Sequence, residues 1–386
     1  MKKTLSFSLA LLLCACILIP FTACSDPYKD IEYVDTPYAG TTLYVYNWGE
    51  NIANGEDGSM NLERVFEKKY KINVEYTTYP SNEEMYAKLS SGTVHYDLII
   101  PSDYMIARLI EEDRIQKLDF SQIPNYQNIQ EQYRNNQYYD CNGANGAAEY
   151  SVPYTVGMFG IIYNTKTVDE ADVKDQSWSL MWNEKYKGKL INFNNSRDAF
   201  AVAMFYNHID VNTTDKAEWE KAYNSLLEQK PLLKGYYMDE IYNQMEGNNA
   251  DAAIYYAGDC LSMIGNNEDL AFYYPVEGTN TFVDAMCIPK DAQNVGAAHL
   301  FINFLLEEEY AVENSLYTCY ASPNQKVIDS ARYKEELGED SYKILYDLPA
   351  QYKNEDGTIN TKICQSYENL NSDTKKLLSE LWSKLK

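Results

Sequence analysis

The first third of the sequence alternates apolar stretches with amphipathic ones, and this alternation constrains the fold more than any other feature of the chain. Apolar residues at every second position predict strands, and apolar residues three or four apart predict helices. The expected strands cover residues 43–48, 72–77 and 96–100, and the expected helices cover residues 61–70, 81–89 and 104–112. Ser81 and Glu84 can form a capping box where the second helix begins. Strands that alternate with helices predict an α/β fold with a mainly parallel sheet flanked by helices.

The remainder of the chain follows a loop rich in Asn, Gly and Ala at residues 137–149. Beyond this loop we expect strands at residues 157–163, 252–256 and 282–288, and helices at residues 199–208, 216–229, 242–246 and 296–306. About 345 residues follow position 40, which is too many for one ordinary hydrophobic core. We therefore expect two lobes, with the first crossing between them near residue 152.

Where several expected strands end, the sequence places an aromatic residue close to an acidic or hydroxyl-bearing one. The four instances are Trp48 with Glu50, Ser102 with Tyr104, Tyr256 with Asp259, and Phe282 with Asp284. Ligands of α/β sheets bind beyond the carboxyl ends of the strands, so the fold can bring these residues together. A ring face beside a negative charge suits a ligand that is both apolar and cationic. We interpret the four pairs as parts of one site.

Residues 1–23 have the charged start, apolar middle and small final residues of a secretory signal. Cys24 follows directly and resembles the acylated cysteine of a bacterial lipobox, although Phe21 stands where leucine is usual. Residues 24–40 would then form a flexible lipidated tether. Plain secretion with an unmodified Cys24 is the alternative. Outside the signal, no stretch reaches the roughly 18 apolar residues that a membrane span needs.

The charge of the chain narrows the range of partners. The formal net charge is −24, and removal of the signal, which has two lysines and no acids, makes it −26. A nucleic acid is not expected as a partner, because phosphate binding needs basic patches. An acidic body attracts cations instead.

The sequence offers little of the chemistry that catalytic and metal sites need. Five cysteines follow position 40, an odd number without CxxC spacing, and three histidines are scattered. We therefore expect no disulfide framework, although one bridge stays open, and no zinc site. The glycine-rich phosphate loop, the dinucleotide fingerprint and the GxSxG motif are all missing from the sequence. The many carboxylates keep a secreted hydrolase with an acid and a base carboxylate as an alternative.

Several motifs carry a resemblance to a known family. They are Tyr46-Asn47-Trp48, the run Tyr79-Pro80-Ser81-Asn82-Glu83-Glu84-Met85-Tyr86-Ala87-Lys88-Leu89, Tyr96-Asp97-Leu98-Ile99-Ile100-Pro101-Ser102, and Leu300-Phe301-Ile302-Asn303-Phe304-Leu305-Leu306. From about residue 41 to the C-terminus, with insertions such as residues 135–148, the chain resembles the polyamine-binding proteins of spermidine/putrescine ABC importers. The resemblance implies a two-lobed, periplasmic-binding-protein-like type II fold. Lobe 1 would comprise residues 41–152 and 281–329, and lobe 2 residues 153–280 and 330–386.

The resemblance also implies which side chains contact the ligand. They are Trp48, Glu50, Ser102, Tyr104, Asn195, Asp198, Tyr256, Asp259, Phe282, Asp284, Tyr320 and Glu368. Gly49, Asn51, Asn195 and Tyr256 replace residues that are common in the family, which leaves putrescine and spermidine both open as ligands. Asp284 is expected to anchor an ammonium group, because an acid within the apolar run 281–288 is costly without a cationic partner.

The same resemblance sets expectations for partners and location. We expect a polyamine ligand, an ABC permease as partner, no enzymatic activity, no cofactor and no metal, and a monomer. The lipidated Cys24 would hold the exported protein at the outer face of the cell membrane, in the periplasmic space where an outer membrane exists. The alternatives are a carrier of the same fold for another cationic solute, a secreted hydrolase, and an adhesin that uses the tyrosine-rich surface.

Overall fold

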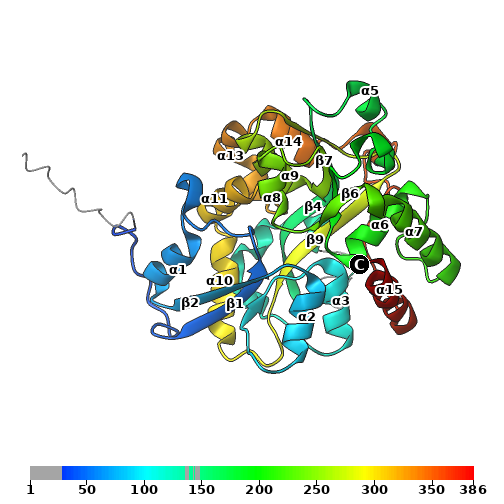
Figure 1. Cartoon of the computed structure of the whole chain (residues 1–386). Helices are drawn as coiled ribbons and strands as arrows, with labels where there is room; N and C mark the ends of the chain where they lie inside the picture. Colours follow the sequence, from blue (N-terminus) through cyan, green and yellow to red (C-terminus); the bar gives the residue numbers. More distant parts are fainter. Residues whose placement is uncertain (1–27, 135–138, 142, 144–147) are drawn as a thin grey trace, which may run out of the picture.

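A computed structural model describes residues 28–134, 139–141, 143 and 148–386 (Figure 1). Its strands join in the order β2-β1-β3-β9-β4-β7-β5-β6, with β8 attached to β4 and β10 to β9. The expected signal and Cys24 lie outside the described residues. None of the described helices has the length and apolar character needed to cross a membrane.

The first lobe is built on β1 (Thr42–Trp48), which pairs in parallel with β2 (Asn73–Tyr79) and with β3 (Leu98–Ile99). Alternate side chains of β1 enter separate clusters, because successive residues of a strand point to opposite faces. Leu43 and Val45 pack with α1 (Leu62–Tyr70) and α10 (Val295–Leu305). Tyr46 packs on the other face with α2 (Asn82–Ser90) and α3 (Asp103–Glu111). Figure 1 shows these helix pairs on opposite sides of the strands.

The second lobe has its own core around β5 (Leu190–Phe193), which pairs in parallel with β6 (Leu233–Tyr237) and β7 (Ala252–Tyr256). The elements that cover it are α6 (Ser196–Tyr206), α7 (Lys216–Gln229), α8 (Ile241–Glu246), α9 (Ala257–Asn266), β8 (Leu270–Tyr273) and α15 (Ser372–Leu385). Trp178 and Trp219 are fully buried in this core. The C-terminal helix α15 packs on α6 and α7 and so belongs to the same lobe.

Two long strands join the lobes, β4 (Ser151–Asn164) and β9 (Thr279–Cys287). They are antiparallel, and the second half of β4 leaves β9 to pair with β7 and β8. Gly157 lies opposite Phe282 near this exchange of partners, and a Cβ at Gly157 would lie 2.4 Å from the Phe282 ring. The lobe boundaries that we expect at 152/153 and 280/281 fall inside these two strands, and they stay a prediction.

The remaining α-helices and strand are short, except for α11 with its 11 residues. They are α4 (Glu131–Arg134), α5 (Glu170–Val173), α11 (Glu308–Thr318), α12 (Gln325–Asp329), α13 (Ala331–Leu337), α14 (Glu339–Tyr346) and β10 (Cys364–Gln365). A small cluster around buried Tyr333 packs α13 and α14 against α11. The chain after α11 therefore lies along both lobes, because α14 also contacts α9.

The strong sequence patterns are confirmed, and the two expected ranges 216–229 and 252–256 coincide with α7 and β7. The Ser81 hydroxyl oxygen accepts a 3.2 Å bond from the Glu84 amide at the start of α2, as the capping pattern predicts. The sequence did not predict β5, β6, β8, α9, α11 or α15. The missed strands are four or five residues long, so too few residues repeat for a period to stand out.

The expectation of a flexible tether up to Gly40 does not hold for residues 28–40. Tyr28, Ile31 and Tyr38 pack against the core of the first lobe. The Val34 amide donates a 2.7 Å bond to the carbonyl of Lys69, so the backbone is also held. The two prolines and polar residues suggested a linker, but three apolar anchors outweigh them.

The cysteines of the described part are all free thiols, so the bridge left open by the sequence does not form there. Cys260, Cys287 and Cys364 are buried among apolar neighbours, as expected of small core residues. Cys141 is exposed and Cys319 is partly buried.

Candidate functional site

A pocket lies between the lobes, where the loops after β1, β3, β6 and β7 meet β9. Six carboxylates line it, Glu50, Asp103, Asp198, Asp239, Asp259 and Asp284. Its rings are those of Trp48, Tyr79, Tyr104, Tyr255, Tyr256, Phe282, Tyr320 and Tyr367. Among the described residues that line the pocket there is no lysine, arginine or histidine. Within the described part of the chain, no group of three or more His, Cys, Asp or Glu is placed to hold a metal ion.

Asp284 projects from β9 and is 6% exposed. The Ser102 hydroxyl donates a 2.6 Å bond to Oδ1, and the Thr155 hydroxyl donates a 3.2 Å bond to Oδ2. Burial raises the pKa of Asp284 to about 7, while the two hydroxyl bonds act in the opposite direction. The Asp284 carboxyl is thus oriented by one hydroxyl of the first lobe and one of the connecting strand β4.

Asp198 lies in the first turn of α6, where Asn195 caps the helix by accepting a 2.9 Å bond from the Arg197 amide. The Tyr256 and Tyr367 hydroxyls donate bonds of 2.6 and 2.9 Å to the two oxygens of Asp198. Burial raises the pKa of Asp198 to about 6. Both hydroxyl partners of Asp198 come from the second lobe.

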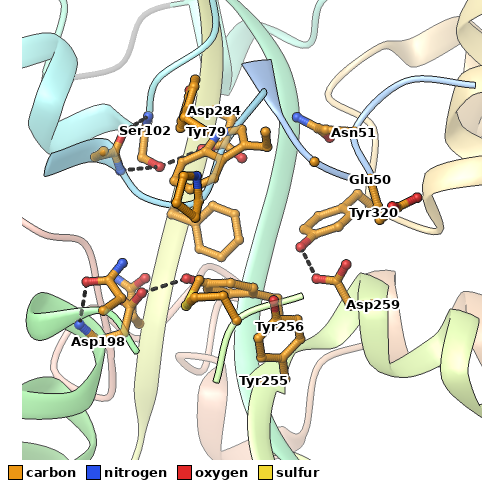
Figure 2. A pocket seen from close by; sticks show the side chains of 18 of the residues that line it. Glu50, Asn51, Tyr79, Ser102, Asp198, Tyr255, Tyr256, Asp259, Asp284 and Tyr320 are labelled. Atoms are coloured by element: carbon orange, nitrogen blue, oxygen red, sulfur yellow. Dashed lines mark hydrogen bonds between the residues drawn. The ribbon is translucent and has the colours of Figure 1, made fainter. Parts of the chain in front are cut away.

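Asp259 lies in the first turn of α9 and is held in the same manner. The Tyr242 hydroxyl donates a 2.7 Å bond to Oδ1. The Tyr320 hydroxyl donates a 2.5 Å bond to Oδ2 (Figure 2). Burial raises the pKa of Asp259 to about 6, and the charges of Asp239 and Glu50 raise it further. Tyr320 follows α11, whose Tyr310 is part of the core of the first lobe, so we count Tyr320 with that lobe. This bond therefore joins the two lobes.

The three aspartates share one arrangement, in which each carboxylate accepts bonds from two hydroxyl groups. A neutral hydroxyl orients a carboxylate without cancelling its charge. Each oxygen also keeps a second lone pair, which a further donor can use. No basic side chain is among the described residues that line the pocket, and buried Arg197 next to Asp198 is the basic neighbour that lowers the pKa of that carboxyl. The arrangement therefore suits a ligand that brings positive charge.

Aromatic rings form flat walls between the carboxylates. Tyr256 meets Phe282 edge-on with ring centroids 5.5 Å apart, and Trp48 tilts against Tyr79 at 4.7 Å. A Cβ at Gly258 would lie 2.5 Å from the Tyr320 ring, so glycine lets that ring rest on α9. The Trp48 indole nitrogen is buried without a hydrogen-bond partner among the described residues. Such walls suit the methylene segments of a chain-like ligand.

One end of the pocket, which we call the outer end, contains Asp259, Glu50 and Asp239. Glu50 and Asp239 also line a second cavity next to the pocket, so they stand at the border of the two. Asp198 and Asp284 line the pocket but not the second cavity, and we call the part of the pocket that they line the inner end. Figure 2 shows Glu50, Tyr320 and Asp259 gathered on one side, with Asp198 on the other.

The structure brings eleven of the twelve expected residues to this one pocket. They are Trp48, Glu50, Ser102, Tyr104, Asn195, Asp198, Tyr256, Asp259, Phe282, Asp284 and Tyr320. Glu368 is the exception, because it is exposed and lines other hollows, while its neighbour Tyr367 lines the pocket. The alignment thus missed the pocket by one position in a segment that is neither helix nor strand.

The sequence reasoning also missed several lining residues. Asp103 and Asp239 are the two further acids, and Tyr79, Asn82 and Tyr255 add polar or aromatic surface. Asp103 stands within the expected pair Ser102 and Tyr104, so that motif already contained it. Asp239 follows β6. Because the sequence did not predict this strand, no strand end marked Asp239 as a candidate site residue.

Two lobes joined by a pair of strands, with a buried polar and aromatic pocket between them, define a two-lobed solute-binding protein of the periplasmic-binding-protein-like type II fold. The chain belongs to the bacterial extracellular solute-binding proteins, whose family model matches residues 64–338. This family is not a class of enzymes.

Individual relatives agree with this assignment. The spermidine/putrescine-binding periplasmic protein of Escherichia coli is 33% identical over 284 residues, which cover 73% of this chain and 78% of that protein. A solved structure from Listeria monocytogenes, named as a spermidine/putrescine ABC transporter, has a TM-score of 0.76 and 31% identity, covering 89% of this chain and 98% of that chain. The TpPotD lipoprotein of Treponema pallidum has a TM-score of 0.72 and 26% identity, with 89% and 99% covered.

Proposed function

We propose that the protein captures a polyamine between its lobes and delivers it to an ABC permease, as the resemblance to spermidine/putrescine-binding proteins suggests. One observation carries the proposal: the pocket is lined by six carboxylates, three of which accept bonds from a pair of hydroxyl groups, and by no basic side chain among the described residues. Burial raises the pKa of Asp103 to about 8, so this group is mostly protonated at neutral pH. A neutral or anionic solute would leave the ionised carboxylates of the set uncompensated.

The energetics of ammonium binding fit the geometry. An ammonium group has three donors and loses hydration in a cleft, so it needs acceptors at fixed positions. A hydrogen bond to a charged group contributes about 1.5–3 kcal/mol, and a desolvated cation over a ring about 2 kcal/mol. Two anchored ammonium groups with ring contacts along the methylenes reach about −8 kcal/mol after the cost of association, which is micromolar binding. The eleven residues of the pocket that the sequence singled out are the proposed contacts.

Closure of the lobes supports a capture role. The Tyr320 hydroxyl reaches Asp259 across the cleft, and the Tyr104 ring meets the Tyr367 ring edge-on at 5.7 Å. The Asn369 amide donates a 2.5 Å bond to Glu111 of α3 on the far side of the pocket. A ligand that contacts both lobes favours this closed form over an open one, because its affinity for the two differs.

We also propose that the protein is exported, that Cys24 is lipidated, and that the molecule acts as a monomer at the outer face of the cell membrane. The signal-like residues 1–23 support export. The small residues before Cys24 and the lipoprotein among the relatives support the anchor. Mass spectrometry of the mature N-terminus tests it, because an acylated Cys24 adds the mass of the lipid and replaces Met1 as the first residue.

A thermal-shift screen tests the proposed function. Putrescine, spermidine and spermine should each raise the melting temperature saturably, whereas sugars and acidic amino acids should not. Basic amino acids serve as the control for another cationic solute, and stabilisation by these alone would replace the polyamine with a different cargo. Recovery of unchanged amine after prolonged incubation separates a carrier from a hydrolase.

A further inference from the structure

Residues 28–40, which we call the strap, lie along helix α1 of the first lobe. The Asn61 amide, at the start of α1, donates a 2.8 Å bond to the Tyr28 hydroxyl. Near the other end of α1, the Val34 amide donates a 2.7 Å bond to the carbonyl of Lys69. The strap therefore follows α1 over most of its length.

The strap is also held on α10. The Tyr38 ring packs against the core of the first lobe and lies on Gly296, where an added Cβ would overlap the ring. Just after the strap, the Thr41 hydroxyl donates a 2.7 Å bond to the Tyr38 carbonyl and accepts a 2.7 Å bond from the Asn294 side chain. Because α1 and α10 both cover β1, each of these contacts is with the first lobe.

The strap shortens the distance between the proposed anchor and the folded body. A free tether of residues 24–40 could span about 56 Å, since an extended chain covers about 3.5 Å per residue. With the strap bound, only three residues separate Cys24 from Tyr28. The Cα atoms of these two residues therefore lie within about 14 Å of each other. An anchor at Cys24 thus brings the α1 side of the first lobe to the lipid.

The outer side of the strap is amphipathic. Tyr33 and Val34 are each 43% exposed. Nζ of Lys71, which is exposed as well, lies 4.2 Å from the centroid of the Tyr33 ring. The exposed charged residues of the strap itself are Lys29, Asp30, Glu32 and Asp35. An exposed tyrosine ring beside charges of both signs suits the headgroup region of a bilayer, where tyrosine is enriched.

The second lobe lies away from this surface. Figure 1 shows α1 on one side of the molecule, and α7 and α15 of the second lobe on the other. The lobes are joined by β4 and β9, so one lobe can turn relative to the other about these strands. A first lobe that is fixed at the membrane leaves the second lobe to carry the movement.

We propose that the strap docks the α1 side of the first lobe on the lipid surface, so that this lobe stays in place while the second lobe moves when a ligand binds. The inference rests on the proposed lipidation of Cys24 and on the proposed capture of a ligand between the lobes.

Energy transfer to a labelled lipid tests the inference. The acylated protein is placed on phosphatidylcholine vesicles that contain an acceptor dye, with the exposed Cys141 replaced by Cys141→Ser. The donor dye is attached at Arg64→Cys in α1 or at Glu228→Cys in α7, two exposed positions. We expect the transfer efficiency from position 64 to be at least twice that from position 228. Addition of spermidine should change the efficiency from position 228 and leave that from position 64 unchanged.

Variants that release the strap give an independent test. Tyr38→Ala removes the ring that packs against the core, and Gly296→Ala places a methyl group where that ring lies. Each should lower the transfer efficiency from position 64 at least two-fold. Tyr33→Ala is the matched control, because it removes an exposed ring of the same strap, and its efficiency should equal that of the wild type. Thermal unfolding and spermidine titration show that each variant is folded and binds.

The possible failures can be told apart. Equal efficiencies from the two positions, or no change in both Tyr38→Ala and Gly296→Ala, overturn the docking of the strap and leave the proposed anchor and function intact. A larger response to spermidine at position 64 than at position 228 overturns the assignment of the moving lobe. A protein that the vesicles do not retain overturns the proposed anchor, and one that binds no polyamine overturns the proposed function.

Discussion

The inner and outer ends of the pocket are assembled in different ways. At the inner end, Asp284 accepts hydroxyl bonds from Ser102 of the first lobe and from Thr155 of the connecting strand β4. Asp198 accepts both of its hydroxyl bonds from within the second lobe. At the outer end, Asp259 receives one bond from Tyr242 of its own lobe and one from Tyr320 of the other. Glu50 and Asp239 likewise come from separate lobes. The carboxylates of the inner end are therefore oriented without a bond across the cleft, whereas Asp259 at the outer end accepts one bond that forms only when the lobes meet.

This difference separates two tasks that one pocket must perform. Carboxylates that are oriented before the ligand arrives bind it at a low entropic cost. Groups that meet only on closure link occupancy to the shape that a membrane partner can recognise. We therefore expect changes at the inner end to alter affinity most, and changes at the outer end to alter closure and selectivity.

The largest effect should come from Asp284→Asn at the inner end. The amide keeps the shape of the side chain but removes the charge that faces an ammonium group, so polyamine affinity should fall by about 2 kcal/mol or more, roughly thirty-fold. Titration calorimetry measures this change. The ligand-free variant should be at least as stable as the wild type at pH 8, because an uncompensated buried charge has been removed. Unchanged affinity would remove Asp284 from the site.

Gly258→Ala should produce the next largest effect, by hindering closure at the outer end. The new Cβ would lie 2.5 Å from the Tyr320 ring, and such overpacking costs about 1–3 kcal/mol, or roughly ten-fold in affinity. Gly265→Ala is the control in the same helix, since its Cβ would meet no atom within 4 Å. Small-angle scattering with ligand should show a more open Gly258→Ala variant. Equal affinities in the two variants would contradict this view of closure.

Tyr320→Phe and Tyr242→Phe allow a direct comparison of the two lobes, because each removes one hydroxyl bond to the Asp259 carboxylate. The loss of one such bond costs about 1 kcal/mol, or roughly five-fold in affinity. Only the Tyr320 bond crosses the cleft, so Tyr320→Phe should also speed ligand release in stopped-flow experiments. A similar increase in the release rate for Tyr242→Phe would show that the distinction between the two hydroxyls is wrong.

The smallest expected effect is that of pH. With pKa values of about 7 for Asp284 and about 6 for Asp198 and Asp259, a change from pH 8 to pH 7 should weaken binding about two-fold, since protonated carboxyls bind ammonium poorly.

In the ligand-free protein, the same three carboxyl groups make folding stability decrease as pH rises, whereas they make ligand affinity increase. Their folded pKa values lie above the ordinary value of 3.8, so the folded state holds protons that the unfolded state has lost. Their contribution to stability is thus present at low pH and is lost as pH rises through the range from about 4 to 7. The increase in melting temperature on adding spermidine should be larger at pH 8 than at pH 6. An increase independent of pH would show that these carboxyls do not exchange protons for the ligand.

The sequence predicted the fold best where the physical signal is local. The alternation in the first lobe follows from side-chain period alone, and α7 and β7 were bounded correctly for the same reason. The strand β6 was missed because Gly235 interrupts its short apolar run. The packing of Tyr28, Ile31 and Tyr38 on the first lobe depends on a tertiary surface that no local pattern reveals.

The site residues that could be predicted from the sequence are those that lie at or near the ends of recognisable strands. Trp48, Ser102, Tyr256 and Asp284 stand beside recognisable strands, and the fold brings them together. Tyr367 comes from a segment without regular structure, and it enters the pocket because its hydroxyl is bound to Asp198. Only the folded chain shows that contact, which explains why Glu368 was chosen one position away.

The pairing of Gly157 with Phe282 has a mechanical consequence. The Phe282 ring is a wall of the pocket, and it also rests on the strand about which the lobes would turn. A ligand that contacts the Phe282 ring therefore also acts on the strands that connect the two lobes. A small rotation at this crossing point would move the edges of the lobes most, because they lie farthest from it.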